Sequence, residues 1–190
     1  MTATAPWDVK GLQWGLDYTA ASYPKLENVK IPVVWAYVTG TDDIKWTAAQ
    51  VSRRIDMGSK LIRINQGYES TSLFDEDEFD VESLAWTNEQ AVAVANDRAA
   101  RKWSTRFYTS YDNYTALTKA IGDKPYVYYH IAAWPFTDLA QLALHRNIYA
   151  VQYASSTANP DYVVPGTSLT LKDVNADVNL DLGIFTGWVD

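Results

Sequence analysis

Short runs of Val, Ile, Tyr and Trp recur along the chain and alternate with amphipathic or polar stretches. Runs of this length, rich in β-branched and aromatic residues, are typical of buried strands. The pattern predicts eight strands, over residues 15–18, 33–38, 60–65, 78–82, 106–110, 126–132, 148–153 and 175–179.

Between these strands, apolar residues at helical spacing predict four helices, over 47–57, 88–102, 113–121 and 139–144. Thr47 is the expected N-cap of the first helix, and Gly58 is its expected stop. Residues 155–171 are polar and interrupted by Pro and Gly, which predicts a long loop before the last strand.

Strands that alternate with helices predict an α/β fold, and eight of them favour a compact (β/α)8 TIM-like barrel. A doubly wound open sheet is the alternative, because the same alternation fits it. The 190 residues form a single expected domain, 1–190, and are few for such a barrel. The connection before Asp80 is short, so we expect one barrel helix to be missing or reduced there.

Composition and charge exclude several classes of function. The chain has no cysteine, which excludes disulfides, thiolate metal sites and a cysteine nucleophile. Its two histidines, His130 and His145, form no HExxH pair, and we expect neither a metal nor another cofactor. His130 lies in a predicted strand, where a hydrogen-bonded core histidine is the simpler interpretation.

The net charge of −7 and the absence of a basic cluster argue against nucleic acid as a partner. No apolar run has the length of a membrane span, so no membrane partner is expected. Residues 1–6 lack the charged and apolar regions of a signal peptide, and none is expected.

Four carboxylates fall where a barrel carries its chemistry, at the mouth formed by the C-terminal ends of the strands. Asp17 ends the first predicted strand, Asp80 and Glu82 lie on the fourth, and Asp177 lies on the eighth. Residues i and i+2 of a strand share a face, roughly 6–7 Å apart, so Asp80 and Glu82 would face one cleft while Val81 points away.

Neighbouring carboxylates in such a cleft differ in proton affinity, so one can act as a general acid while the other stays ionised. Glycoside cleavage needs one protonated and one ionised carboxyl group. The alternative is a solvated acidic loop, because an acidic run, 75–78, directly precedes the pair.

Six segments, in order and over nearly the whole chain, resemble the family 25 glycoside hydrolases, which are lysozymes, and the related glycoside-hydrolase-like domains of actinobacteria and their phages. The first is similar to the family's opening GxDxS strand, and the second to its DxE strand. The segments are GLDYT at 15–19, FDVE at 79–82, RFYTS at 106–110, YHIAAW at 129–134, VQYAS at 151–155 and DVN at 177–179.

The resemblance implies a (β/α) barrel that cleaves the β-1,4 bond after N-acetylmuramic acid in peptidoglycan. It implies that Glu82 is the general acid and that Asp80 orients the substrate N-acetyl group or stabilises the oxocarbenium-like state. Asp17 and Asp177 would line the cleft and tune the protonation of the pair. The implied substrate-binding residues are Gln152 and Tyr153 at the cleft floor, and Trp134, Tyr108 and Tyr37 as sugar-stacking aromatics.

Two hypotheses of different class follow. The first is a muramidase-like peptidoglycan hydrolase of a phage or an actinobacterium, acting as a lysin or as a virion-associated wall-degrading module. It would be part of the virion or be released at lysis to act on the cell wall. The second is an inactive barrel that binds glycan or contacts other virion proteins. It is motivated by residues 64–68, INQGY, which replace the aromatic, histidine-containing third strand typical of these lysozymes.

Overall fold

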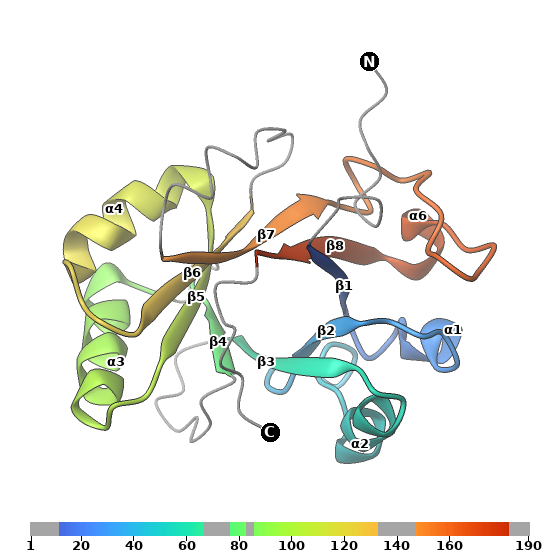
Figure 1. Cartoon of the computed structure of the whole chain (residues 1–190), viewed down its shortest axis with the longest axis horizontal. Coiled ribbons are helices and arrows are strands. Elements are labelled where there is room, and N and C mark those ends of the chain that lie inside the picture. The colour runs from blue at the N-terminus through green and yellow to red at the C-terminus, as the bar shows by residue number, and fades with distance from the viewer. Residues whose placement is uncertain (1–11, 67–76, 83–85, 133–146, 183–190) are drawn as a thin grey trace.

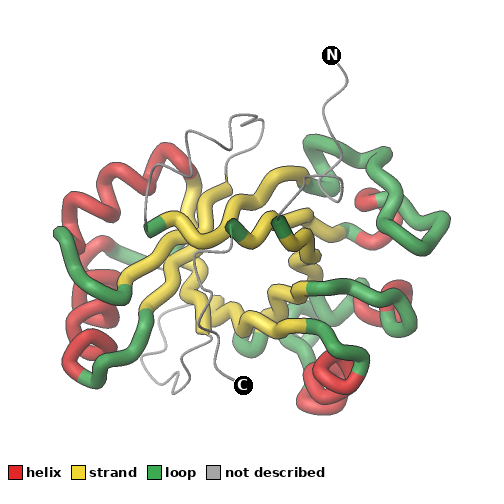
Figure 2. The backbone as a smooth tube through the Cα atoms, viewed as in Figure 1, coloured by secondary structure: helices red, strands yellow, loops and turns green. Residues whose placement is uncertain are grey.

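The computed structural model describes residues 12–66, 77–82, 86–132 and 147–182. Eight strands close into a barrel in their order along the chain (Figures 1 and 2). The strands are β1 Gln13–Tyr18, β2 Val33–Tyr37, β3 Lys60–Gln66, β4 Asp77–Asp80, β5 Thr105–Ser110, β6 Val127–Ala132, β7 Ile148–Ala154 and β8 Ala176–Asp181. The barrel prediction is confirmed, and the open sheet is excluded.

The direction of β8 departs from an all-parallel barrel. Each strand from β1 to β7 runs parallel to the next, whereas β8 runs antiparallel to both β7 and β1. The beginning of β8 therefore lies beside the C-terminal ends of the other strands. Asp177, near the start of β8, comes to the barrel mouth for this reason.

Helices cover the barrel on two sides (Figure 1). Within the described residues they are α1 Tyr23–Leu26, α2 Ala48–Asp56, α3 Asn88–Ala100, α4 Tyr111–Ile121 and α6 Leu171–Val174. The helices α3 and α4 contact each other and lie beside β4, β5 and β6, while α1, α2 and α6 cover the opposite side. The predicted helix over 139–144 and the connection over 67–76 lie outside the described residues.

Capping residues explain where the helices begin. Thr47 and Thr87 form capping boxes with Gln50 and Gln90 at the starts of α2 and α3, which confirms the predicted N-cap Thr47. Two short helices, α1 and α6, were not predicted. The α6 helix occupies the end of the expected long loop, where Thr170 and the residue three positions later form another capping box.

Strand alternation divides the core into an inner and two outer parts. Phe79 and Phe107 point outward and pack with residues of α3 and α4. Leu16 and Val178 point outward on the other side and pack with α1 and α6. Trp35 belongs to an inner cluster with residues of β3 and β7. The inward positions that remain at the mouth are largely polar.

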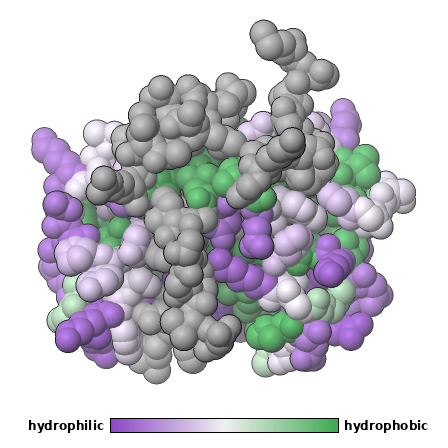
Figure 3. All heavy atoms as spheres, in the orientation of Figure 1, coloured by the Kyte–Doolittle hydropathy of each residue, from purple (hydrophilic) through white to green (hydrophobic). Residues whose placement is uncertain are grey.

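The outer surface is mostly hydrophilic over α3 and α4 (Figure 3). In the described part of the chain, no helix is both long enough and apolar enough to cross a membrane.

A substitution at Gly15 tests how closely the inner wall of the barrel is packed. A Cβ at Gly15 would lie 2.3 Å from the Val33 carbonyl oxygen and 2.5 Å from the Trp35 ring. We therefore expect Gly15→Ala to lower the free energy of unfolding by about 1–3 kcal/mol, because an added methyl group forces neighbours to shift. Urea denaturation measures it. The control Gln13→Ala, at an exposed position of the same strand, should stay within about 0.5 kcal/mol. Equal midpoints for both variants would contradict this packing.

Candidate functional site

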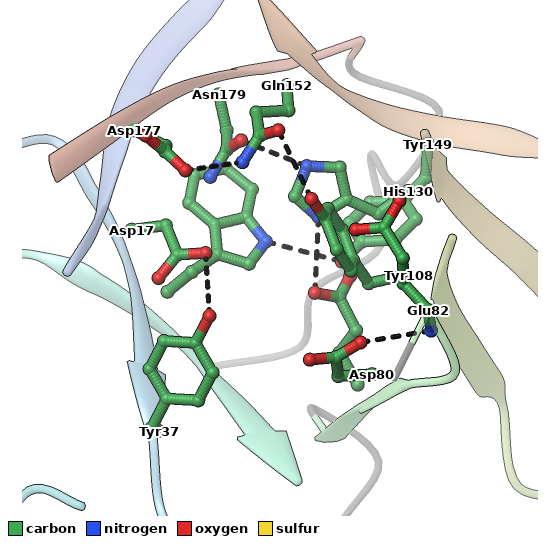
Figure 4. A network of polar contacts seen from close by, with 12 residues as sticks. Asp17, Tyr37, Asp80, Glu82, Tyr108, His130, Tyr149, Gln152, Asp177 and Asn179 are labelled. Carbon is green, nitrogen blue, oxygen red and sulfur yellow. Dashed lines mark hydrogen bonds and ion pairs between the residues drawn. The ribbon is translucent and has the colours of Figure 1, made fainter. Parts of the chain in front are cut away.

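Three of the four predicted carboxylates meet inside the barrel mouth (Figure 4). Asp17 on β1 and Asp177 on β8 lie directly opposite each other in the antiparallel ladder. Asp80, the last residue of β4, is close enough for its charge to act on Asp17. The sequence prediction that acids distant in the chain converge at one mouth agrees with this geometry.

The pKa of Asp17 is strongly perturbed by its surroundings. Its side chain is buried, and burial raises the pKa of Asp17 well above its usual value. The negative charges of Asp177, Glu78 and Asp80 raise this pKa further. A hydrogen bond from the Tyr37 hydroxyl to Asp17 Oδ2, at 3.4 Å, acts weakly in the opposite direction. The site therefore favours the protonated form of Asp17.

Asp177 receives stronger hydrogen bonds. Gln152 Nε2 donates to Asp177 Oδ2 at 2.9 Å, and the Ser156 backbone N–H donates to Oδ1 at 3.0 Å. Burial raises the pKa of Asp177, but the hydrogen bonds from Ser156 oppose that rise. Because two N–H donors point at Asp177, a proton shared by the pair resides preferentially on Asp17.

The prediction for the DxE segment needs a correction. The strand β4 ends at Asp80, so Glu82 follows the strand instead of lying on it as predicted, and a further buried acid, Glu78, lies two residues before Asp80. Glu82 lies past the strand end and is exposed, and its backbone N–H donates to Asp80 Oδ1 at 3.1 Å. Val81 points away into the cluster beside α3, as expected.

Glu82 still belongs to the mouth. Burial and, after it, the negative charge of Glu82 raise the pKa of Tyr108 on β5 far above its usual value. Figure 4 shows the Glu82 side chain beside Tyr108, at the edge of the polar network. The mouth thus has one exposed acid at its rim and buried acids within.

A buried polar layer below the mouth was missed by the sequence analysis. His130 on β6 is fully buried, with Nδ1 3.1 Å from Glu78 Oε1 and Nε2 3.0 Å from Asn179 Oδ1. The Tyr149 hydroxyl donates a short hydrogen bond to Glu78 Oε2. His130 is thus a hydrogen-bonded core histidine, as expected. The partner of His130, Glu78, could have been found in the sequence, because it lies two residues before Asp80 and so shares its face of the strand.

The predicted sugar-binding residues divide into three groups. Tyr108, Gln152 and Tyr37 are in the network: the Tyr108 hydroxyl donates to Gln152 Oε1 at 3.1 Å, and Tyr37 contacts Asp17. Tyr153 is a correction, because it packs outside the barrel with the α1 and α6 cluster rather than on the cleft floor. Its direction follows from strand alternation, because Gln152 points inward and adjacent residues of a strand point to opposite faces. Trp134 lies outside the described residues.

Among the residues that the structure describes, no group of three or more His, Asp and Glu side chains is placed to hold a metal ion. The mouth presents carboxyl, hydroxyl and amide groups, with Tyr37 and Tyr108 as aromatic residues.

Two solved structures have a similar fold. One is a family 25 glycosyl hydrolase from Bacillus anthracis, with 10% sequence identity, a TM-score of 0.55, and coverage of 90% of this chain and 89% of that chain. The other is an uncharacterized protein of B. stearothermophilus, with 10% identity, a TM-score of 0.53, and coverage of 89% and 95%. The fold is thus the barrel that the sequence resemblance implied. No protein-family model and no curated protein matches the chain.

Asp17→Asn tests the buried charge. Because the folded pKa of Asp17 is raised, Asp17 contributes stability that is fully present below its unfolded pKa of about 3.9 and is lost as pH rises through the folded value. Asn is neutral at every pH. We expect Asp17→Asn to weaken the pH dependence and, at neutral pH, to stabilise the fold by more than the roughly 0.5 kcal/mol typical of surface substitutions. Urea unfolding at several pH values measures both effects.

Asp43→Asn is the control, because Asp43 is exposed and a hydrogen bond from Thr41 lowers its pKa. Any effect of Asp43 on the pH dependence should therefore have the opposite sign. If wild type and Asp17→Asn lost stability in parallel as pH rises, Asp17 would not carry the buried charge.

Proposed function

We propose that this chain is a muramidase-like glycoside hydrolase that acts on a cell-wall glycan. The observation that carries the proposal is the meeting of Asp17, Asp80 and Asp177 at one barrel mouth, with Glu82 at its rim. The shared fold with a family 25 glycosyl hydrolase supports it. Since barrels host many activities, the arrangement of acids counts for more than the fold.

Glu82 is the general acid in this proposal. An acid that protonates a leaving oxygen must be reachable from solvent, and Glu82 is the exposed acid of the site. A sugar bound over it would exclude water, and burial favours the protonated form of a carboxyl group. Glu82 would then donate its proton to the glycosidic oxygen as the C–O bond breaks.

Asp80 is the complementary group. It is buried two residues before Glu82, and the Glu82 backbone N–H donates to its Oδ1 at 3.1 Å. A hydrogen bond from an N–H favours the charged form of a carboxylate. Asp80 is thus suited to stabilise positive charge at the sugar carbon or to orient an N-acetyl group in the transition state.

The remaining groups of the mouth bind and position the sugar. Asp17, as a protonated carboxyl group, offers a hydrogen-bond donor, while Asp177 offers acceptor oxygens. Gln152 links Asp177 to Tyr108 and fixes their relative positions. Tyr37 and Tyr108 provide rings of the kind on which sugars stack.

The finer proposal concerns the bond and the biological setting. The target would be the β-1,4 bond after N-acetylmuramic acid in peptidoglycan, and the carrier a phage or an actinobacterium. The protein would act as a lysin released at lysis or as a virion-associated module in contact with other virion proteins. The sequence resemblance alone supports this part.

A second candidate function is glycan binding without cleavage. Glu82 lies past the end of β4 and is exposed, and β3 ends in Asn65 and Gln66, where the resembling lysozymes have an aromatic, histidine-containing strand. A barrel that retained the mouth as a binding surface would show both features.

Glu82→Gln separates these functions. If Glu82 is the general acid, we expect the clearing rate of purified actinobacterial cell walls to fall by at least about 100-fold, because amides cannot donate the required proton. A turbidity assay measures it. The matched control Glu89→Gln, an exposed glutamate in the first turn of α3, should clear walls at nearly the wild-type rate. Unchanged clearing by Glu82→Gln would refute the assigned acid, and wild-type glycan binding without clearing would favour the second function.

A further inference from the structure

A cavity of about 270 Å³ lies beside Glu82, outside the polar network of the barrel mouth. We call it the side pocket. It opens between the residues that follow β4, the beginning of α3 and the first half of α4. Because Glu82 belongs to both the mouth and the side pocket, a ligand in the mouth can extend a substituent into the pocket.

The floor of the side pocket is apolar. Val81, Ala91 and Leu117 line it, and all three are buried. Their side chains also pack together in the outer cluster that joins β4 to α3 and α4. An apolar floor of this kind takes a methyl group or the flat face of a small ring, and it disfavours a charged group.

The rim of the side pocket is polar and oriented. Asn113 Nδ2 donates to Thr109 Oγ1 at 3.0 Å, which fixes the amide plane. Its Oδ1 accepts no hydrogen bond from the described residues, so it presents an acceptor. Asn88, the first residue of α3, lies on the same rim, and the N–H of a first helical residue has no intrahelical partner. The Gln90 N–H of the same turn is already bonded to Thr87. The rim therefore offers the Asn113 oxygen as an acceptor and the Asn88 N–H as a donor.

We propose that the side pocket binds the acetamido group of the leaving sugar, whose glycosidic oxygen faces Glu82; this group is distinct from the N-acetyl group that Asp80 would orient on the other sugar. This inference rests on the proposed function. The methyl group would lie on the apolar floor, the amide N–H would donate to Asn113 Oδ1, and the amide oxygen would accept from the first turn of α3. An acetamido group combines a methyl group for the apolar floor with an amide donor and an amide acceptor for the polar rim.

Charge and size restrict the alternatives. The carboxylate of Glu82 repels an anionic group, and an ammonium group would meet an apolar floor and the positive end of the α3 dipole. The volume is below the roughly 300–1,000 Å³ of pockets that enclose a drug-sized ligand. The side pocket thus fits one substituent or one ring, while the rest of the glycan lies over the mouth.

The test is an NMR titration of the full chain with N-acetylglucosamine, with glucosamine as the comparison ligand. We expect N-acetylglucosamine to cause saturable shifts of the Asn113 and Asn88 side-chain amides. The indole N–H of Trp86, which also lines the side pocket, should shift as well. Glucosamine, which lacks the acetyl group, should bind at least 10-fold more weakly at these signals. Equal affinity for the two sugars, or no shift at these residues, would overturn the inference.

Ala91→Leu fills the floor and should weaken binding of N-acetylglucosamine at least 10-fold. Ala93→Leu is the matched control, because it makes the same change at an exposed position of the same helix and should bind as wild type does. Asn113→Leu removes the acceptor and should abolish the preference over glucosamine, which provides a second variant if Ala91→Leu does not fold. Wild-type affinity in folded Ala91→Leu and Asn113→Leu would refute the pocket assignment.

The titration tests the side pocket and the wall-clearing assay tests the hydrolase, so either proposal can be refuted without the other. Selective binding of N-acetylglucosamine without clearing of walls would support the side pocket and refute the hydrolase. Clearing of walls without a shift at Asn113 or Trp86 would support the hydrolase and refute the side pocket.

Discussion

The site depends on the antiparallel pairing of β8 with β1. This pairing closes the barrel and places Asp177 directly opposite Asp17 at the mouth. Cβ atoms of directly opposed residues lie about 4.5–5.5 Å apart, so two inward carboxyl groups cannot both ionise there without a large electrostatic cost. The asymmetry of their donors then decides which one keeps the proton. In a barrel with a parallel last strand, the start of that strand would lie at the opposite end, away from the other acids.

The residues of the mouth pack against the buried polar layer below it. Glu78 and His130 are both fully buried, and they contact each other while Asn179 and Tyr149 contact their remaining atoms. A buried carboxylate is costly unless hydrogen bonds surround it. The ring of Tyr108 stands edge-on to His130, with centroids 4.9 Å apart. The buried layer thus contacts Tyr108, a residue of the mouth, and its own polar groups are hydrogen-bonded to one another.

The sequence was sufficient for the barrel and for the placement of Asp17 and Asp80 at its mouth, because local patterns encode the strands and the positions where they end. It was insufficient where tertiary contacts decide. The direction of β8, which brings Asp177 to the mouth, depends on its neighbours. The outward direction of Tyr153, by contrast, follows from strand alternation after the inward Gln152. The last residue of β4 is set by its pairing with β5, which ends at Asp80, so the predicted strand extended too far and included Glu82.

The displacement of Glu82 from the strand changes how the acids divide their work. Had Asp80 and Glu82 been i and i+2 on one strand, strand geometry would have directed both side chains into the cleft. Instead Asp80 is buried and receives the Glu82 backbone N–H, whereas the Glu82 side chain stays exposed between the mouth and the side pocket. In the proposed hydrolase, the substrate itself would exclude water from Glu82. In this arrangement, the proposed general acid would be shielded from water only when a sugar covers it. Substrate binding would thereby be coupled to proton transfer.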